Sequence, residues 1–207
     1  MSSARSAILA RVAAARRAGR LPQSPELEPL AIPERTSSEC LARFREELSA
    51  LGVECHVETT EAGVRERVRS LVEGTRVLRW DAECLPYDVD SVLEKATLGS
   101  SPREEQAQAE VGVTGCHGAI AETGTLALLS GKGRSRAVSL LPPLHVAIVE
   151  ARQLCFSMAE FFARESDRIG GEASCTFVTG PSRTADIELT LTLGVHGPGR
   201  VVVVVGP

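Results

Sequence analysis

The sequence predicts an α/β protein with a mainly parallel sheet and flanking helices. Apolar, strand-like runs alternate with helical segments along most of the chain, as in parallel βαβ units. The last run, Val201–Val205, consists of valines alone and lacks polar alternation, so we expect a strand that is buried on both faces. With 207 residues, 43% of them hydrophobic, the chain is long enough to bury roughly 70% of the surface of its unfolded form.

The first part of the chain predicts a helix followed by a linker. Residues 3–18 place apolar residues among arginines and end at Gly19, which is typical of a short amphipathic helix. Such a helix could pack on its own domain or on a second copy, act as an organellar targeting peptide, or lie on a membrane surface; its mostly alanine apolar face favours packing. Four prolines follow between residues 21 and 35. We therefore expect residues 1–35 to form a helix and proline-rich linker, and residues 36–207 to form a single domain.

Capping residues mark two of the later helix starts. Thr36 and Glu39 have the spacing of a capping box, so we expect a helix that ends before Gly52. Ser101, followed by a proline and then a glutamate three residues after the serine, predicts a helix that runs to about Ala109. The other expected elements are helices at 61–72 and 153–164 and strands at 53–57, 75–80, 111–114, 124–129, 145–149, 174–179 and 200–205.

Composition and charge exclude several classes of partner. The net charge is −4, and because residues 1–20 carry five arginines and no acid, the remainder carries −9. A nucleic-acid partner is therefore disfavoured, as is base stacking with only 3% aromatic residues. No apolar run approaches the roughly 20 residues that cross a bilayer, and no secretory signal is evident. We expect no membrane partner and a cytoplasmic location.

The six cysteines do not predict a metal site. They are at least 15 residues apart, so no C-x-x-C pair exists for zinc or iron–sulfur binding. No histidine or carboxylate cluster suggests a metal, and we expect no cofactor. Most of the cysteines are expected to be small buried side chains, and a direct pair between Cys116 and His117 is not expected because adjacent side chains point apart.

Three segments rich in glycine and small hydroxyl residues are candidates for anion binding: residues 111–128, 130–136 and 179–188. Glycine lets backbone N–H groups approach a ligand, and arginine supplies a bidentate fork for carboxylate or phosphate. Each segment alone could be a tight turn, but three of them after successive strands favour a shared site. The candidate anion-binding residues are Thr114, Gly115, Thr123, Gly124, Thr125, Ser130, Gly131, Lys132, Arg134, Gly180, Ser182, Arg183 and Thr184.

Glu122 is the candidate catalytic residue. It lies among small and apolar residues, where an unpaired carboxylate would be costly. Either backbone N–H groups and hydroxyls hold it as a structural brace, or it is a positioned base or nucleophile.

Three motifs together resemble the lactate-utilization protein C family, also called the LUD-domain family. They are G-V-T-G-C-H-G-A-I-A-E-T-G-T at 112–125, S-L-L-P-P-L-H at 139–145 and T-G-P-S-R-T-A-D-I-E-x-x-L-x-x-G-V-H-G-P at 179–198. The resemblance implies a fold similar to the sugar-isomerase, CoA-transferase and folate cyclo-ligase group. It also implies a role in oxidising L-lactate to pyruvate beside iron–sulfur partner proteins. By analogy with CoA-transferases Glu122 would be the nucleophile, whereas His117 is a poor candidate for an essential acid.

Two functions follow as hypotheses. The first is an accessory or regulatory component of L-lactate utilization that binds a small carboxylate or a partner protein through the glycine-rich loops. The second is a stand-alone enzyme, similar to a transferase or isomerase, with Glu122 as base or nucleophile and Arg183 as anion clamp. The expected ligand is a small anion, either lactate- or pyruvate-like or CoA- or phosphate-like, and a homo-oligomer is left open.

Overall fold

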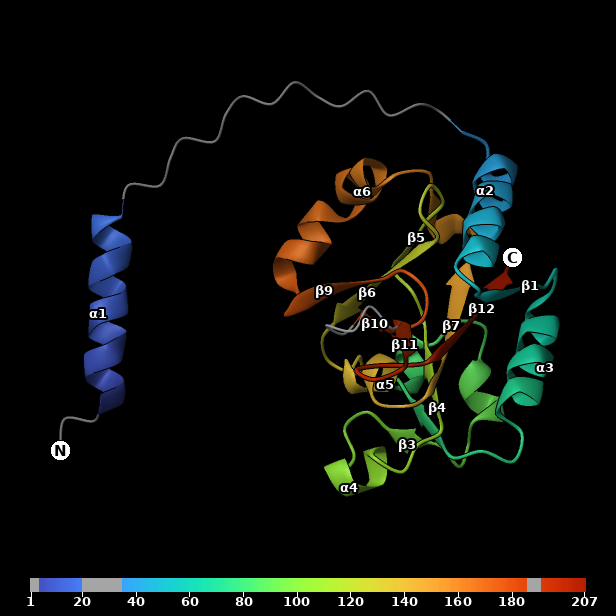
Figure 1. Ribbon diagram of the computed structural model, residues 1–207, viewed down its shortest axis with the longest axis horizontal. Coiled ribbons are helices and arrows are strands. Elements are labelled where there is room, and N and C mark those ends of the chain that lie inside the picture. Colours follow the sequence, from blue (N-terminus) through green and yellow to red (C-terminus); the bar gives the residue numbers. More distant parts are fainter. Residues whose placement is uncertain (1–3, 20–34, 186–190) are drawn as a thin grey trace. The chain divides into compact units, whose positions relative to one another are not determined.

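The computed structural model describes residues 4–19, 35–185 and 191–207, and the chain divides into two units (Figure 1). The unit of residues 1–31 contains helix α1 (Ala4–Ala18), at the position that the sequence predicts. Most of the expected linker lies outside the described residues. The unit of residues 32–207 holds the α/β fold, and the expected domain boundary between residues 35 and 36 stays a prediction.

A parallel sheet is the centre of the second unit, as the sequence predicts. Within the described residues it has six strands, all paired in parallel. Their order across the sheet is β1 (Glu54–Val57), β12 (Arg200–Gly206), β7 (Leu144–Glu150), β4 (Val111–Thr114), β2 (Val77–Arg79) and β3 (Thr97–Leu98). The valines of β12 are at most 2% exposed, which confirms a strand buried on both faces.

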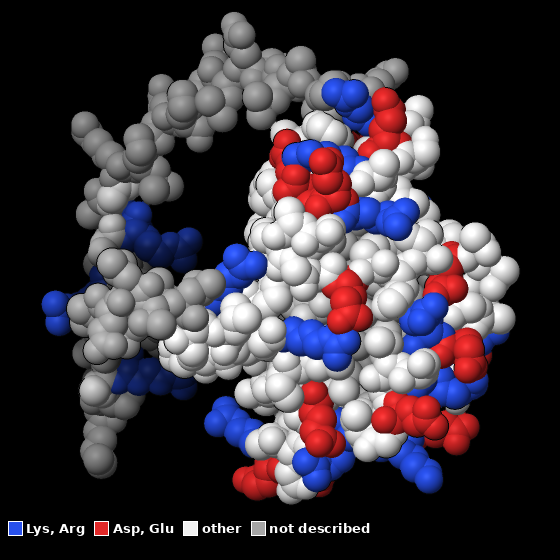
Figure 2. Space-filling model, turned by 45° about the vertical axis from the view of Figure 1, so that its right-hand side comes forward, with Lys and Arg blue, Asp and Glu red and all other residues white. Residues whose placement is uncertain are grey.

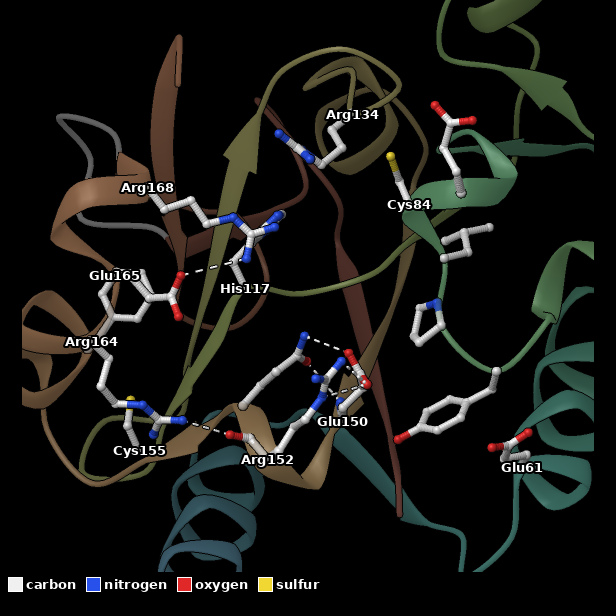
Figure 3. A pocket seen from close by; sticks show the side chains of 16 residues that line it. Glu61, Cys84, His117, Arg134, Glu150, Arg152, Cys155, Arg164, Glu165 and Arg168 are labelled. Carbon is white, nitrogen blue, oxygen red and sulfur yellow. Dashed lines mark hydrogen bonds and ion pairs between the residues drawn. The ribbon is translucent and has the colours of Figure 1, made fainter. Parts of the chain in front are cut away.

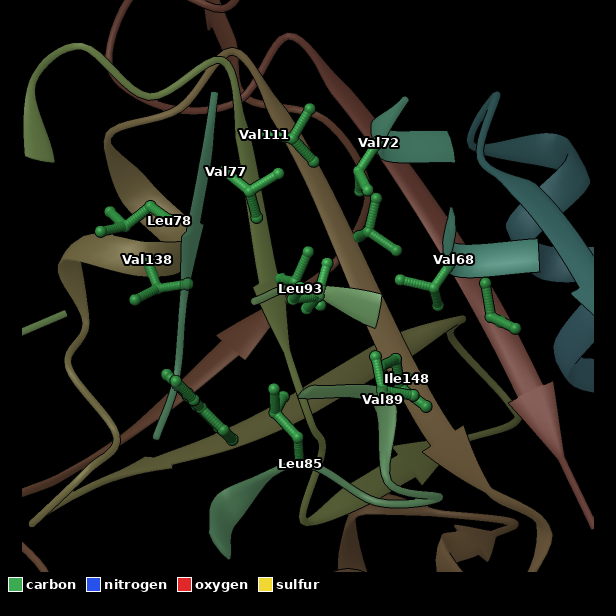
Figure 4. Close-up of a cluster of buried hydrophobic side chains, with 14 of the residues drawn as sticks. Val68, Val72, Val77, Leu78, Leu85, Val89, Leu93, Val111, Val138 and Ile148 are labelled. Carbon is green, nitrogen blue, oxygen red and sulfur yellow. The ribbon is translucent and has the colours of Figure 1, made fainter. Parts of the chain in front are cut away.

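Two helices with capped N-termini pack against β12, each through a different hydrophobic cluster. Helix α2 (Ser37–Ala50) begins with the expected capping box at Thr36 and buries Phe44 and Leu48 in one cluster with Val203. Helix α3 (Glu61–Val72), whose N-terminus is capped by the side chain of the preceding threonine, buries Val68 in another cluster with Val202 (Figure 4). The alternation of the β12 side chains therefore supplies both cores.

A second, mixed sheet was not expected from the sequence. In the described residues it consists of β8 (Leu154–Cys155), β5 (Gly118–Ile120), β6 (Thr125–Ser130) and β9 (Ser174–Val178), in that order. The glycine-rich segment 111–128 thus holds three strands, β4, β5 and most of β6. A small hairpin of β10 (Arg183–Ala185) and β11 (Leu191–Leu193) follows.

Helix α6 (Met158–Gly171) packs on the second sheet through Phe161. The ring lies so close to the backbone of Gly118 that a Cβ atom on this glycine would be 2.4 Å from a ring carbon. Ile120 and Ala127 complete the same small cluster. A glycine at position 118 therefore lets the helix approach the strand.

Two helix predictions were wrong in their bounds. The helix expected from Ser101 to about Ala109 is a single turn, α4 (Arg103–Gln106), because the buried Gln106 side chain donates to the carbonyl oxygens of Gly99 and Ser101 instead of pointing to solvent. The helix expected at 153–164 begins at Met158, since a 3-10 turn (Ala151–Gln153) and β8 occupy the preceding residues. The remaining short helices are α5 (Ala137–Leu140) and the 3-10 turns Ala82–Cys84 and Val89–Val92.

The surface carries charges of both signs. Figure 2 shows one face of the molecule, on which Lys and Arg side chains alternate with Asp and Glu. Many charged side chains of the described residues form ion pairs within one helix, such as Arg69 with Glu66 in α3. In the part of the chain that the structure describes, no helix is long and apolar enough to cross a membrane.

Candidate functional site

A cleft of about 660 Å³ opens where strands of the parallel sheet end, and we call it the edge cleft. Its lining comes from residues 83–87 after β2, His117 after β4, Glu150, Arg152 and Gln153 at the end of β7, Arg134 after β6, and residues of β8, α3 and α6 (Figure 3). The carboxyl ends of parallel strands are the usual place for ligands in α/β sheets, and the volume is that of a small-molecule site.

One face of α6 forms a wall of the edge cleft. Phe161, Arg164, Glu165 and Arg168 all line it, and their spacing of three, four and seven residues places them on the same side of the helix. Arg164 fixes this wall, because its guanidinium donates to the carbonyl oxygens of Leu154 at 3.0 Å and Arg152 at 2.8 Å.

His117 faces the edge cleft as a neutral imidazole. It is 8% exposed, and its Nδ1 accepts a hydrogen bond of 3.1 Å from the backbone N–H of Leu129. Burial, and then the nearby Arg168 and Arg134, lower the pKa of His117 to about 4. The hydrogen therefore sits on Nε2, and among the described residues no atom accepts it.

Arg134 and Arg168 flank His117 (Figure 3). Arg134 forms an ion pair with Glu172 and donates from Nε to the carbonyl oxygen of Leu129 at 3.2 Å, so its position is fixed. Arg168 is held more loosely, since its nearest carboxylate oxygen, on Glu165, is 3.7 Å away and the side chain is 53% exposed. A loosely paired guanidinium at the mouth of a cleft is well suited to bind an anion.

Tyr87 also lines the edge cleft, on a strained piece of backbone. Tyr87 and Asp88 have backbone φ angles of 61° and 54°, which residues other than glycine rarely adopt. The tyrosine hydroxyl donates to a main-chain oxygen of Pro207 at 2.5 Å, and Arg65 donates to the carbonyl oxygen of Tyr87 at 2.9 Å. Burial, together with Glu150, raises the pKa of Tyr87 to about 12. Contacts on both sides therefore keep this part of the cleft in place.

Cys116 does not pair with His117, as expected. Its Sγ lies 2.8 Å from the carbonyl oxygen of Gly118, and burial raises the pKa of the thiol to about 12. Cys84 and Cys155 line the edge cleft, and burial raises the pKa of both thiols. Within the described ranges, no three His, Cys, Asp or Glu side chains gather as a metal site would need.

The first and third glycine-rich segments meet at the end of α2. Gly124 and Gly180, with φ angles of 63° and 77°, both lie against Leu51, and Arg183 donates to the carbonyl oxygen of Leu51 at 3.0 Å. A chain of three hydroxyls, on Thr123, Thr125 and Thr179, links the two segments at 2.8 Å per step. Residues 186–188 of the third segment lie outside the described residues.

The second segment lies at the other end of β6. Ser130 ends this strand and contacts the hydroxyl of Ser174 at 2.8 Å, while Gly131 lies against Glu172 and Lys132 is exposed. The two ends of a six-residue strand are roughly 17 Å apart, so the place where the first and third segments meet is far from the second. His117 of the first segment lies near Arg134 of the second, but among the described residues the structure does not bring all three segments to one place. Arg134 is the candidate residue that the structure places in the edge cleft.

The remaining candidate residues lie in the scaffold. The Thr114 hydroxyl is buried 2.9 Å from Nε2 of His145, and Gly115 packs against the backbone of Cys84. Ser182 exchanges backbone hydrogen bonds with Pro198 and Gly194, and Thr184 lies in the β10–β11 hairpin. Their proposed role in anion binding stays a prediction.

Glu122 lies at the N-terminus of α6 and does not line the edge cleft. Its Oε1 accepts a hydrogen bond of 3.2 Å from the backbone N–H of Met158, and its own N–H donates to the carbonyl oxygen of Phe156 at 2.9 Å. These contacts match the structural brace that the sequence left open, because a carboxylate satisfies free N–H groups at a helix start. A catalytic role for Glu122 stays a prediction.

Comparison with known proteins identifies the family. The LUD domain profile matches residues 87–205, which make up more than half of the chain and include most of the residues that line the edge cleft. The chain belongs to the LUD domain family. The resemblance of the three motifs is thereby confirmed.

Relatives of this LUD domain include several lactate utilization proteins. The chain is 30% identical to "Lactate utilization protein C" of Geobacillus sp. (strain WCH70) over 191 residues, which cover 82% of this chain and 79% of that protein. It is 37% identical to the protein of the same name from Bacillus subtilis (strain 168) over 130 residues, which cover 61% of this chain and 48% of that protein. The alignments thus span from about half to four fifths of these relatives.

A solved structure supports the fold. A DUF162 family protein from Deinococcus radiodurans matches with a TM-score of 0.68 and 24% identity, covering 84% of this chain and all of that chain. The α/β architecture of the LUD domain is thus also found in a crystal structure.

The site residues that sequence reasoning missed are His117 as a donor and the arginines of α6. Arg164 and Arg168 belong to a helix whose start was misplaced, and residues 165–168 lay beyond its expected end. Their spacing from Phe161 was the available signal, since a helix extended by one turn places all three on one face.

Proposed function

We propose that this LUD domain protein takes part in lactate utilization, as an accessory or regulatory component that binds a small anion in the edge cleft. The observation that carries the proposal is its 30% identity, over 82% of the chain, to a protein named for lactate utilization. The motif resemblance further supports a place beside iron–sulfur lactate-utilization proteins.

The edge cleft is the proposed binding site because of its position and its charges. It lies at the carboxyl ends of β2, β4 and β7, and arginines line it from three separate elements: the turn after β6, the 3-10 turn after β7 and helix α6. Arg168 is the least tightly paired of them, with 3.7 Å to its partner oxygen. An incoming carboxylate can replace that long contact with a shorter, charge-assisted hydrogen bond.

A deletion and complementation experiment tests the proposed function. Removing the gene from its host should slow or abolish growth on L-lactate and leave growth on glucose unchanged, and the wild-type gene should restore it. The Arg168→Gln variant should restore growth less well, because it lacks the proposed anion contact.

Arg69→Gln is the matched control. Arg69 also pairs with a glutamate three residues earlier on a helix and is similarly exposed, at 57%, but it lies outside the edge cleft. It should complement as well as the wild type. Unchanged growth on L-lactate after the deletion would refute the role in lactate utilization.

A further inference from the structure

One corner of the edge cleft offers hydrogen-bond donors. We call it the donor corner, and it consists of His117 Nε2 and the guanidinium groups of Arg134 and Arg168. Figure 3 shows the three side chains together on one side of the cleft, with Glu165 beside Arg168, whereas Glu61 lies at the opposite side.

His117 is fixed as a donor. Its Nδ1 accepts a hydrogen bond from the backbone N–H of Leu129. Because that N–H group cannot accept a hydrogen bond, Nδ1 carries no hydrogen, and the hydrogen of the neutral imidazole lies on Nε2. The indole ring of Trp80 packs at 5.7 Å from the imidazole centroid and restricts its orientation. A ligand at Nε2 must therefore offer an acceptor atom.

The arginines add further donors, because guanidinium has no acceptor. Their carboxylate partners, Glu172 and Glu165, each already face an arginine. An anion bound at the donor corner would accept hydrogen bonds from the same guanidinium groups that pair with Glu172 and Glu165. It would compete most easily at Arg168, whose ion pair with Glu165 is the longer of the two.

We propose that the donor corner binds a small carboxylate whose polar atoms are all acceptors, a 2-oxo acid such as pyruvate, in preference to the corresponding 2-hydroxy acid. The carboxylate would pair with Arg168 and the 2-oxo oxygen would accept from His117. This choice of acids rests on the proposed function. The 2-hydroxyl of lactate carries a hydrogen that would have to compete with Arg168 for the carboxylate of Glu165, the acceptor beside the donor corner, and a donor left without an acceptor weakens binding. The protein would then respond to the oxidised product of the pathway.

Isothermal titration calorimetry of the full chain with pyruvate, L-lactate and inorganic phosphate tests the proposal. Pyruvate should bind about tenfold or more tightly than L-lactate, the ratio expected when a ligand group is left unpaired. Equal affinity, tighter binding of L-lactate, or no binding of pyruvate at millimolar concentration would overturn it. Tighter binding of phosphate would overturn the assignment to a carboxylate.

Paired variants assign the effect to residues. His117→Asn keeps an acceptor near Leu129 N–H but removes the donor at Nε2, so the preference for pyruvate should fall to below about threefold. His117→Gln reaches the Nε2 position with an N–H group and should retain more of that preference. If both changes show the same preference as the wild type, His117 does not select the ligand.

Arginine variants keep the test valid if the histidine variants do not fold. Arg168→Gln should weaken pyruvate binding about tenfold or more, and Arg69→Gln should leave it unchanged. If Arg168→Gln and Arg69→Gln change the affinity for pyruvate equally, the pyruvate site does not include Arg168. If the wild-type protein does not bind pyruvate but deletion of the gene still abolishes growth on L-lactate, only the donor-corner proposal is rejected. The growth experiment alone decides the proposed function.

Discussion

Two buried histidines couple stability to pH. Burial lowers the pKa of His145 to about 4, and burial with two arginines does the same for His117. In the unfolded chain each of these histidines becomes protonated as the pH falls through about 6.5, whereas in the folded protein each becomes protonated only near pH 4. Between these values the unfolded state holds more protons, so the free energy of unfolding should decrease as the pH is lowered. The loss is about 2 kcal/mol per histidine by pH 5.

Urea unfolding between pH 7 and pH 5 measures this loss. His145→Asn removes one of the two groups, so this variant should lose only about half as much stability over the same range, whatever its stability at pH 7. His196 is exposed, and His196→Asn is the control that should keep the wild-type pH dependence. A wild-type stability that is constant over this range would contradict the prediction.

At the scale of elements, the docking of α6 on β5 sets the shape of the edge cleft. Gly118→Ala places a methyl group against the Phe161 ring, where it would lie 2.4 Å from a ring carbon, so the helix must move. We expect a loss of about 1–3 kcal/mol in the free energy of unfolding. Ligand binding in the cleft should also weaken, because Arg164 and Arg168 move with the helix.

Gly170→Ala is the matched control for this prediction. Gly170 lies in α6 with no atom within 4 Å of an added Cβ, so alanine should leave stability unchanged or raise it by up to about 1 kcal/mol. Chemical denaturation of both variants measures the difference. A Gly118→Ala protein as stable as Gly170→Ala would show that the helix does not depend on this contact.

Elements with local signals were predictable from the sequence. The capping box at Thr36 and the all-valine strand gave α2 and β12 correctly. Ser101 carries a similar capping pattern but does not cap a helix: the single turn α4 begins after Pro102 without a side-chain cap, and the buried amide of Gln106 donates to nearby carbonyl groups. Strand β5 is three residues long and holds the glycine on which Phe161 packs, so its pattern matched a loop. Tertiary packing, which a local pattern does not encode, decided both cases.

The site was less predictable than the fold. The glycine-rich segments predicted backbone N–H groups that approach an anion, but Gly124 and Gly180 lie against Leu51. The edge cleft instead draws on His117 and Arg168, which are 51 positions apart and meet only because α6 packs across β5. Sequence spacing within one element cannot report such a contact.

At the scale of the whole molecule, the hydrophobic core begins well after the N-terminus. Among the described residues, the three buried clusters draw on residues 40–205 only, starting with Cys40, Phe44 and Leu48 of α2. This supports the proposal that residues 36–207 fold as one domain without the preceding segment.

Removing residues 1–35 should therefore leave the domain intact. The truncated protein should unfold cooperatively within about 4 °C of the full chain, a shift of roughly 1 kcal/mol or less for a domain of this size. Differential scanning calorimetry measures both. Removal of residues 1–50 is the positive control. It deletes Phe44 and Leu48, which are at most 1% exposed, and should therefore abolish the cooperative unfolding transition. This result would show that the assay detects the loss of a core element. A large decrease in unfolding temperature on removal of residues 1–35 would mean that the N-terminal segment belongs to the same folding unit.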